Sequence, residues 1–531
     1  MTPNYNAIIV GGGHNGLVCA CYLAAKGLKV RVLERRPMVG GAAVTEEFHP
    51  GFRNSTASYT VSLLNPKIIR DLRLYEHGLK VVERPFANFL PLSDKPGDYL
   101  KVGGGLQATQ AEVAKFSMRD AEALPRYYAM LDRVAAVLKD LLLETPPNVG
   151  GGLADILQAW KVGKRFKALE MFARRDVLDL FTKSAGDVLD QYFESAAIKA
   201  CFGFDSVVGN FASPYTPGSA YVLLHHVFGE VNGKQGVWGH AIGGMGAITQ
   251  AMAKEAVARG VEITLDAAVN KVVVENNVAV GVQLTSGEVI RAKCVVSNLN
   301  PKLLFGKLVA KQAVTPEFTQ RIDAYKCGSG TFRMNVALST LPRFSCLPEE
   351  GAHLSSGIIM APSLRYMEQA YFDARTFGWS KSPIVEILIP STVDDSLAPP
   401  GKHVASLFCQ HVAPVLPPFT NGTSWDDHRD EVADLMIDTV DKFAPNFKTS
   451  VIARQIHSPL DMERTFGMVD GDIFHGALSL DQLFSARPLL GYGDYRTPIM
   501  RLYQCGSGTH PGGGVTGIPG HNAAREILKD R

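Results

Sequence analysis

Residues 7–34 read AIIVGGGHNGLVCACYLAAKGLKVRVLE and decide the fold. The apolar, β-branched run 7–10 is typical of a buried parallel strand, 17–26 predicts a helix, and 30–33 predicts a second strand. A G-x-G-x-x-G motif joins the first strand to the helix, and Glu34 follows the second strand. Strand, glycine turn, helix, strand and acid in this order predict a Rossmann-like dinucleotide-binding unit.

Each part of this unit has a physical task. Gly11 permits the tight turn, Gly13 lets the backbone approach a pyrophosphate, and Gly16 lets the helix pack closely on the strand. The start of the helix offers free N–H groups to the anion, and Glu34 would accept hydrogen bonds from an adenosine ribose. A purely structural glycine turn is the alternative, and the complete unit favours dinucleotide binding over it.

The next stretch distinguishes between dinucleotides. Residues 35–43 read RRPMVGGAA, so a second glycine pair follows the acid closely. Backbone without side chains there would let a longer cofactor pass along the pyrophosphate. The stretch resembles the extended fingerprint of FAD-dependent oxidoreductases of the glutathione-reductase-like superfamily, so we expect FAD rather than NAD.

Two later regions repeat the glycine-rich pattern. The sequence GGMGA at 243–247 predicts the start of a helix, and strands are predicted at 261–265, 269–274, 279–284, 289–291 and 294–298. Near the C-terminus a predicted strand, 500–505, leads through GSGTHPGGGVTGIPG into a predicted helix, 521–529. A flexible loop is the alternative for this last turn, but the flanking strand and helix favour backbone lying against a ligand.

Several motifs together resemble the phytoene-desaturase-related FAD-dependent oxidoreductase family, and the chain is also similar to desaturase-like carotene ketolases. The motifs are HNGLV at 14–18, GGAAVTEE at 40–47, SPYTPGS at 213–219, GGMGA at 243–247, LSLDQL at 478–483 and the glycine-rich stretch 506–517. They cover nearly the whole chain in order. The likeness is specific for the family and much less so for the substrate.

The expected architecture is α/β, with a Rossmann-like FAD-binding domain of the glutathione-reductase-like superfamily and a discontinuous inserted α+β substrate domain. We expect the FAD-binding domain to comprise 1–75, 236–300 and 495–531. The substrate or cap domain would comprise 76–235 and 301–494. The active site is expected between them.

The resemblance also implies roles for individual residues. Those implied to bind pyrophosphate and ribose are Gly11, Gly13, Gly16 and Glu34. Those implied along the path to the flavin are Arg35, Gly40, Gly41, Ala42 and Ala43, with Val269 meeting adenine. Those implied beside the isoalloxazine are Gly508, Gly513, Gly514, Val515 and Thr516. Related flavoproteins often carry an acid after the last strand, but this chain has Gly506-Ser507-Gly508 there, so ribityl contacts are expected from backbone or hydroxyl groups.

Catalytic side chains are harder to predict, because a flavin supplies the hydride chemistry itself. The candidates for the pocket are His510, Thr509, His240 and Tyr59, with Trp238 and the pair His225-His226 as further possibilities. A structural role is the alternative for each of them. The histidine pair has no third ligand at a suitable spacing, so no metal site is predicted.

The leading expectation is oxidation or desaturation of a mostly apolar, isoprenoid-like substrate by hydride transfer to flavin N5. A flavin-dependent reductase or a redox-neutral isomerase of a polyene is the first alternative, and a flavin-bearing interaction partner with little turnover is the second. Residues 103–108 match G-x-G-x-x-A, but no strand ending in an acid follows, so a hairpin turn is expected there. Without an NAD(P)H domain, a quinone or oxygen is the expected electron acceptor.

Composition limits which binding partners and which cellular compartment are expected for the chain. The chain has 531 residues, 46% hydrophobic and 20% charged, and its net charge of +2 provides no global field for nucleic acid. Eight scattered cysteines without a C-x-x-C pair indicate unpaired thiols in a reducing compartment. No apolar run reaches the roughly 18 residues of a spanning helix, and no signal or transit peptide is evident, so a cytoplasmic protein is expected.

Residues 153–181 combine apolar residues at helical spacing with six lysines and arginines. A basic amphipathic segment of this kind can lie on an anionic membrane surface. It can also be a core helix or a contact between copies in a homo-oligomer, with a solvated basic face, and this second interpretation is the one favoured from sequence.

Overall fold

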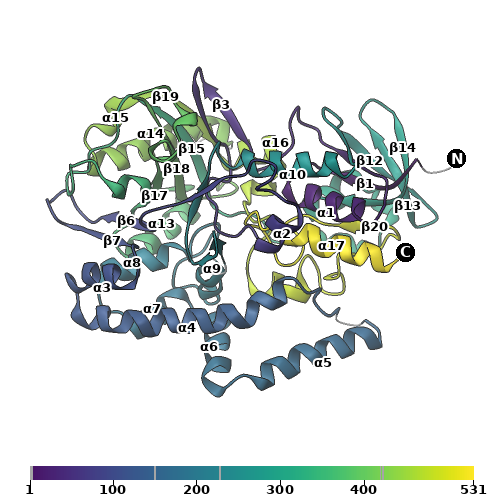
Figure 1. Cartoon of the computed structure of the whole chain (residues 1–531), viewed down its shortest axis with the longest axis horizontal. Coiled ribbons are helices and arrows are strands. Elements are labelled where there is room, and N and C mark those ends of the chain that lie inside the picture. The colour runs from purple at the N-terminus through teal and green to yellow at the C-terminus, as the bar shows by residue number, and fades with distance from the viewer. Residues whose placement is uncertain (1–3, 149–150, 226–228, 419, 421–423) are drawn as a thin grey trace.

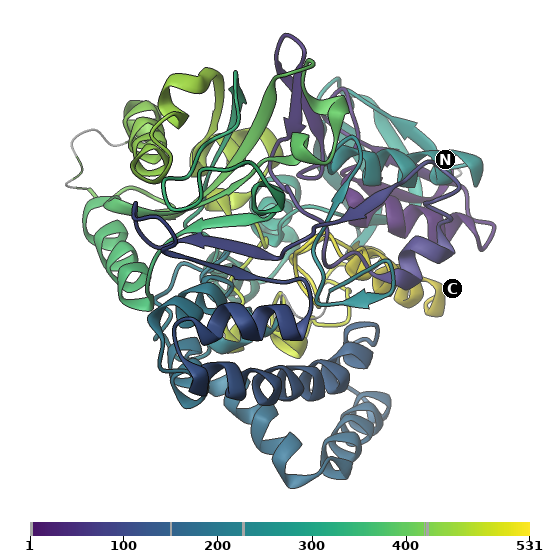
Figure 2. The same cartoon turned by 60° about the vertical axis from the view of Figure 1, so that its left-hand side comes forward.

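The computed structural model describes residues 4–148, 151–225, 229–418, 420 and 424–531. Two β-sheets lie next to each other, and a layer of helices lies below them in the views of Figures 1 and 2. Helices and parallel strands alternate around the first sheet, which confirms the predicted α/β class. Among the described residues, no helix combines the length and apolarity that crossing a membrane requires.

The first sheet contains the N-terminal unit. Its parallel strands follow the order β11, β2, β1, β14, β20, and β12 and β13 extend it as an antiparallel meander on β14. All seven strands fall within 1–75, 236–300 and 495–531. Their bounds are β1 Tyr5–Val10, β2 Val30–Leu33, β11 Glu262–Thr264, β12 Val269–Glu275, β13 Val278–Leu284, β14 Val289–Ser297 and β20 Leu502–Gln504.

Three elements of this sheet differ from their predicted bounds. The two strands predicted at 289–291 and 294–298 are one strand, because the first part of β14 pairs with β13 and the rest continues directly beside β1. Helix α1 (His14–Ala24) begins inside the glycine motif, with Gly13 as its N-cap. Helix α17 (Ile518–Lys529) begins three residues earlier than predicted, directly after Gly517.

Helices α1, α10 (Gly246–Ala258) and α17 pack together against this sheet (Figure 1). The approach of α17 to α1 requires a glycine, because a Cβ atom on Gly520 would lie 2.2 Å from the Asn15 carbonyl oxygen. This close packing brings the C-terminal glycine-rich turn next to the N-terminal one. Segments separated by about 500 residues therefore border the same region.

The second sheet is mixed and has the order β19, β15, β18, β17, β16, β6, β7. Helices α13 (Leu364–Phe377) and α14 (Trp425–Phe443) pack against it, and α16 (Pro459–Phe466) follows β19. Its strands fall within 76–235 and 301–494. They are β6 Asn88–Pro91, β7 Tyr99–Val102, β15 Phe332–Leu338, β16 Gly357–Met360, β17 Trp379–Leu388, β18 His403–Val412 and β19 Val451–His457.

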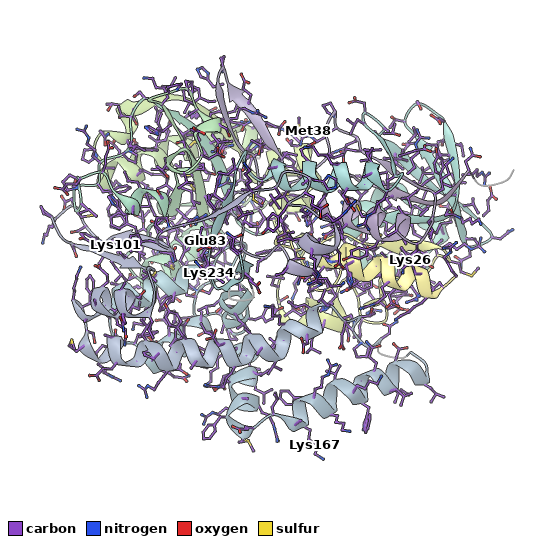
Figure 3. All side chains as sticks on the ribbon, in the orientation of Figure 1. Lys26, Met38, Glu83, Lys101, Lys167 and Lys234 are labelled. Carbon is purple, nitrogen blue, oxygen red and sulfur yellow. The ribbon has the colours of Figure 1, made fainter. Side chains whose placement is uncertain are left out.

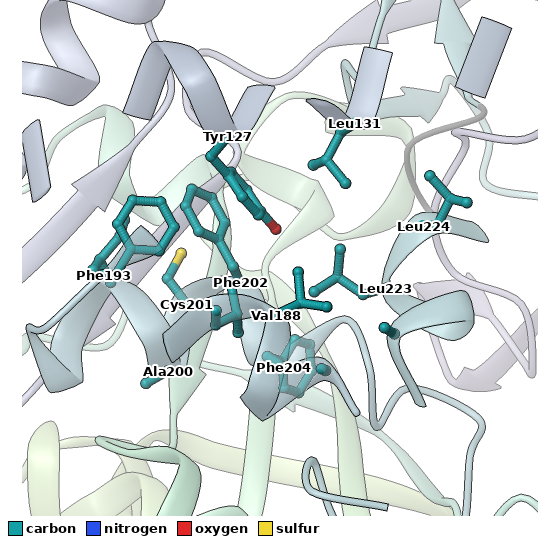
Figure 4. Close-up of a cluster of buried hydrophobic side chains, with 14 of the residues drawn as sticks. Tyr127, Leu131, Val188, Phe193, Ala200, Cys201, Phe202, Phe204, Leu223 and Leu224 are labelled. Atoms are coloured by element: carbon teal, nitrogen blue, oxygen red, sulfur yellow. The ribbon is translucent and has the colours of Figure 1, made fainter. Parts of the chain in front are cut away.

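The helical layer has its own apolar core, part of which Figure 4 shows around Tyr127 and Phe202. It consists of α3 Leu106–Ala114, α4 Met118–Leu142, α5 Leu153–Ala168, α6 Met171–Thr182, α7 Ala185–Tyr192, α8 Ala196–Phe204 and α9 Ser219–His225. The glycines at 103–105 lead from β7 into α3, so the hairpin turn expected there is wrong.

Helix α5 contributes little to this core, and Phe166 is its residue that packs against it in the described part of the chain. Leu153 is 80% exposed, Ile156 61%, Leu157 60% and Trp160 62%, while Gln158, Val162 and Phe166 on the opposite face are half-buried. Figure 3 shows Lys167 at the outer side of the same helix, pointing away from the molecule. For α5 the interpretation as a core helix is therefore wrong, because its strongest apolar face is turned to solvent, whereas Val177 and Leu180 of α6 in the same segment belong to the core. The other part of that interpretation, a contact between copies, stays a prediction.

Candidate active site

A cleft of about 520 Å³ opens at the carboxyl ends of β1, β2 and β14. Such ends are where nucleotide ligands bind in open parallel sheets. Many of the residues predicted for the cofactor line this cleft. They are Gly11, Gly13, Glu34, Arg35, Gly40, Gly41, Ala42 and Val269.

The floor of the cleft is backbone. A Cβ atom on Gly13 would lie 2.7 Å from the Asn298 amide nitrogen, and one on Gly41 would lie 3.3 Å from the Gly13 Cα atom. The Gly40 N–H donates to the Gly12 carbonyl at 2.9 Å, which holds the two glycine pairs together. Gly16 does not line the cleft. It packs under the turn, where a Cβ atom would lie 2.3 Å from the Gly11 carbonyl oxygen.

Glu34 is buried at the end of β2, with only 6% of its surface exposed. One carboxylate oxygen accepts the Gly12 N–H at 2.7 Å and the other accepts the Arg36 N–H at 2.9 Å. The carboxylate therefore shapes the glycine turn. Because each carboxylate oxygen has two lone pairs, it can still accept hydrogen bonds from a ligand in the cleft.

Two adjacent arginines have different tasks at the rim. Arg35 donates to the backbone carbonyls of Arg464 and Thr465, at 3.1 and 2.7 Å, and so ties the end of α16 to the cleft. Arg36, which the sequence analysis did not select, donates to Glu46 at 2.7 Å and lies 5.1 Å from the centre of the Phe466 ring. Its Nη1 atom is buried without a hydrogen-bond partner among the described residues.

Two buried histidines, also missed from sequence, stand at the inner end of the cleft. The Nε2 atom of His14 and the Nδ1 atom of His475 lack a hydrogen-bond partner in the part of the chain that the structure describes. Burial lowers the pKa of His14 to about 3 and that of His475 to about 4, so both are neutral. Together with Arg36, they leave unpaired polar atoms on residues that line the cleft, as a site for a polar cofactor requires.

An inner cavity of about 110 Å³ adjoins the cleft. His14, Ala42, His475 and Ser507 border both. Of the residues predicted for the flavin or the substrate, Tyr59, Trp238, Gly514 and Val515 line this cavity. Its other walls are largely apolar and include Leu63, Phe204, Val208, Phe408 and Phe474.

Val515 adopts a φ of 58°, a left-handed conformation that β-branched residues rarely take. Backbone in this conformation costs on the order of 1–3 kcal/mol and is commonly kept where a ligand site needs it. Ser507 also belongs to this C-terminal turn, and its Oγ accepts a hydrogen bond from the Asn15 amide at 3.1 Å. The Ser507 hydroxyl therefore lies in the turn where related flavoproteins often carry an acidic residue, which this chain lacks.

An outer cavity of about 420 Å³ adjoins the inner one. Four side chains border both cavities: Arg84, Asn88, Asp205 and Trp238. The outer cavity lies against the helical layer, where Tyr127, Leu131, Phe202 and Leu223 form part of its wall (Figure 4). Cleft, inner cavity and outer cavity thus follow one another from the first sheet to the helices.

A hydrogen-bonded pair lies in the wall of the inner cavity. The Tyr59 hydroxyl donates to Glu386 at 2.6 Å, and the Arg333 guanidinium lies 4.3 Å from the centre of the Tyr59 ring. Burial raises the pKa of both Tyr59 and Glu386. This pair can hold or exchange a proton beside a substrate.

The other three predicted catalytic residues lie away from both cavities. His510 Nε2 lies 3.2 Å from the Leu141 carbonyl, and burial lowers its pKa to about 4. Thr509 donates to the Gly506 carbonyl at 2.8 Å, and the His240 ring lies 2.9 Å from Asp394. These contacts give the three residues structural tasks, so their positions do not support the catalytic roles expected of them.

Some residues implied along the path to the flavin or beside the isoalloxazine are packing residues here. Ala43 accepts a hydrogen bond from Thr249 at 2.8 Å, and Thr516 accepts one from the Ile518 N–H at 3.1 Å. Gly508 and Gly513 pack against Pro301 and Phe474 respectively. Of the pair His225-His226, the second residue lies outside the described residues, and the side chain of the first is not described.

Across the described ranges, no three His, Cys, Asp or Glu side chains gather as a metal site would require. The cleft itself fits FAD on structural grounds. It has a glycine floor, a buried acid at the end of the second strand and unpaired polar atoms on Arg36, His14 and His475.

Comparisons with known proteins agree with this geometry. The family model described as flavin containing amine oxidoreductase matches residues 16–528. Pyridine nucleotide-disulfide oxidoreductase domain-containing protein 2 of Rattus norvegicus is 40% identical, with 100% of this chain and 94% of the relative covered. The motifs resemble the branch containing that protein, and this resemblance is confirmed.

A more distant relative and a solved structure also match over nearly the whole chain. Phytoene desaturase (lycopene-forming) of Pseudescherichia vulneris is 26% identical, with 96% of each chain covered. The solved structure of a triple mutant of putrescine oxidase shares the fold, with a TM-score of 0.60, 16% identity and coverage of 99% of this chain and 98% of that one. The chain thus belongs to the flavin-containing amine oxidoreductase family, and its cofactor is FAD.

Proposed function

We propose that this oxidoreductase dehydrogenates a mostly apolar, isoprenoid-like substrate at the FAD. One observation carries the proposal: a largely apolar inner cavity adjoins the glycine-floored cleft at His14, Ala42, His475 and Ser507. A substrate in that cavity would meet the part of the cofactor that extends beyond the pyrophosphate. The likeness to a phytoene desaturase supports an apolar substrate.

The residues of the cleft define how FAD would be held. Backbone of Gly11, Gly13 and Gly41 would face the pyrophosphate, Glu34 would accept hydrogen bonds from the ribose, and the Ser507 hydroxyl would face the ribityl chain. The FAD, when bound, supplies the two-electron chemistry. The protein therefore needs to orient the substrate and keep water out.

The inner cavity meets these two needs. Phe204, Phe408 and Phe474 give it apolar walls that exclude water. Tyr59 and Glu386 place one hydrogen-bonded proton in this wall, and the buried Arg333 beside them compensates the charge of the carboxylate. His14 and His475 are neutral and add no charge near the reacting carbon atoms.

Anaerobic stopped-flow mixing tests the proposal. Oxidised, FAD-loaded protein is mixed with saturated or partly saturated isoprenoids, and photoreduced protein is mixed with the matching polyenes. Flavin reduction in the first experiment is expected. Flavin reoxidation by a polyene without oxygen would indicate the reductase instead, and double-bond isomerisation without net flavin oxidation would indicate the isomerase. Reoxidation with a quinone or with oxygen then identifies the acceptor.

A separate surface supports contact with a membrane. The outward face of α5 combines Leu153, Ile156, Leu157 and Trp160 with Lys164 and Lys167 further along the same face. Across 156–168 the sequence carries four basic residues and no acidic one. We propose that this face lies on an anionic bilayer, because its charge is complementary to such a surface and its apolar side chains are otherwise exposed.

Vesicle sedimentation tests the membrane contact. Vesicles of phosphatidylcholine with phosphatidylglycerol should retain the protein, and vesicles of phosphatidylcholine alone should retain much less. Leu157→Gln with Trp160→Gln should abolish retention, whereas Phe377→Gln, at an exposed phenylalanine on α13, should not. A homodimer in solution that the same double substitution dissociates would show that a second copy covers this face instead.

A further inference from the structure

The junction between the inner and outer cavities is polar, although both cavities are largely apolar. Arg84, Asn88, Asp205 and Trp238 border both cavities, and we call these four residues the collar. They come from distant parts of the chain. Arg84 follows β5 (Val81–Glu83), which pairs with β10 (Gly239–Ala241), and the Arg84 N–H donates to the Trp238 carbonyl at 3.0 Å.

Arg84 is a cation without a direct ion-pair partner in the described part of the chain, and Glu386 is near enough to act on its charge. None of the ion pairs within 4.0 Å includes it. Its guanidinium donates to the Thr60 hydroxyl and lies 5.9 Å from the centre of the Trp238 ring. A guanidinium carries five N–H donors, so most of them remain available to a ligand at the collar.

The acids near Arg84 do not neutralise it. The Asp205 carboxyl has no hydrogen-bond or ion-pair partner among the described residues, and burial together with the nearby Glu386 raises its pKa to about 8. It is therefore mostly protonated at neutral pH. Glu386 already accepts the Tyr59 hydroxyl and has a second guanidinium, that of Arg333, nearby.

We infer that the substrate carries a carboxylate on its apolar body, and that Arg84 binds this group at the collar. The inference rests on the proposed function and narrows its substrate class. A guanidinium matches a carboxylate with two parallel hydrogen bonds, and a protonated Asp205 can donate a third. An ammonium substrate fits this junction poorly, because the collar has no unpaired anion to receive it.

The experiment compares ligands that differ only in their head group. Farnesoate, methyl farnesoate and farnesol are titrated into FAD-loaded protein, and binding is measured by calorimetry and by perturbation of the flavin absorbance. Farnesoate should bind at least 10-fold more tightly than its methyl ester. Arg84→Gln should remove this difference and leave the ester affinity within about 2-fold, and Arg84→Lys should retain part of it.

Arg126→Gln is the matched control, because Arg126 is an exposed arginine on α4 and does not line either cavity. It should leave all three affinities unchanged. Equal affinity of the wild type for farnesoate and methyl farnesoate, or an equal loss for both in Arg84→Gln, would overturn the carboxylate inference and leave the proposed function intact. Failure of all three ligands to bind the FAD-loaded protein would overturn the apolar substrate itself, and the inference with it.

Discussion

The cofactor cleft and the substrate cavities are neighbours with opposite construction. The cleft floor is backbone from glycine-rich turns at the ends of parallel strands, and ten of the residues that line the cleft lie within 11–42. The cavities are walled mainly by side chains from the second sheet, the helical layer and connecting segments, brought together from residues 14 to 515. A backbone site depends on a short motif, whereas a side-chain site depends on how distant elements pack.

The polar groups of the cleft and of the cavities differ in how far they are paired. In the cleft, His14, Arg36 and His475 keep unpaired polar atoms. In the inner cavity, the Tyr59 hydroxyl donates to Glu386, and Arg84 at the collar makes no ion pair within 4.0 Å among the described residues. Changes in the cleft should therefore alter FAD content, and changes in the cavities should alter substrate handling with FAD still bound.

The largest effect is expected for Gly13→Val. A Cβ atom there would lie 2.7 Å from the Asn298 amide and would occupy the path of the pyrophosphate. We expect a folded protein with flavin occupancy near background and affinity for added FAD reduced by more than about 100-fold, because the added side chain would fill the space through which the pyrophosphate meets the backbone. Circular dichroism checks the fold, and flavin absorbance measures the FAD occupancy and the affinity for added FAD.

Gly163→Val is the control for this substitution, because nothing lies within 4 Å of a Cβ atom at Gly163. It should retain normal FAD content. Yellow, FAD-saturated Gly13→Val protein would show that the cleft floor does not face the cofactor.

A smaller loss of FAD is expected for Glu34→Ala. The substitution removes a ribose acceptor and also the bonds to the Gly12 and Arg36 N–H groups. Losing a hydrogen bond to a charged group costs roughly 1.5–3 kcal/mol, so the FAD dissociation constant should rise roughly 10- to 100-fold. Fluorescence titration of the apoprotein measures this constant, and an unchanged value would remove Glu34 from the cofactor site.

Tyr59→Phe should distinguish the function of the substrate cavity from that of the cofactor cleft. It removes the hydroxyl bound to Glu386 and keeps the ring beside Arg333. FAD content should stay at the wild-type level, while the rate of flavin reduction by substrate should fall roughly 10-fold, the effect of about 1.4 kcal/mol. Loss of FAD from this variant would contradict the division between cleft and cavity.

A last effect, on folding stability rather than on FAD or substrate, is expected in the pH dependence of unfolding. Asp205 has an ordinary pKa of 3.8, and burial raises it to about 8 in the folded protein. The folded state therefore binds the proton more tightly, and the contribution of this group to stability is present below pH 4 and is lost as pH rises toward 8. Asp205→Asn should flatten this part of the profile in urea unfolding, and an unchanged slope would show that Asp205 is ionised in the folded protein.

The helix α5 shows where sequence reasoning reached its limit. Its apolar and basic residues were visible in 153–181, but the same pattern suits a core helix, an oligomer contact or a membrane surface. Which neighbours cover a helix face depends on tertiary packing, and here the face with Leu153 and Trp160 has none in the described chain. The prediction of catalytic residues met the same limit. His510 lies in a glycine-rich motif and His240 just before one, but their rings contact structural partners.

By itself, the sequence determined the Rossmann unit, the cofactor class and the glycine floor of the cleft with its buried acid, because glycine spacing and strand hydrophobicity act within a few tens of residues. Only the tertiary structure decided that Tyr59, Arg84, Asp205 and Glu386 meet around one substrate path. Glu386 lies in β17, whereas the other three lie in separate connecting segments, and the four share no local pattern. Their proximity results from long-range packing, which no short stretch of sequence encodes.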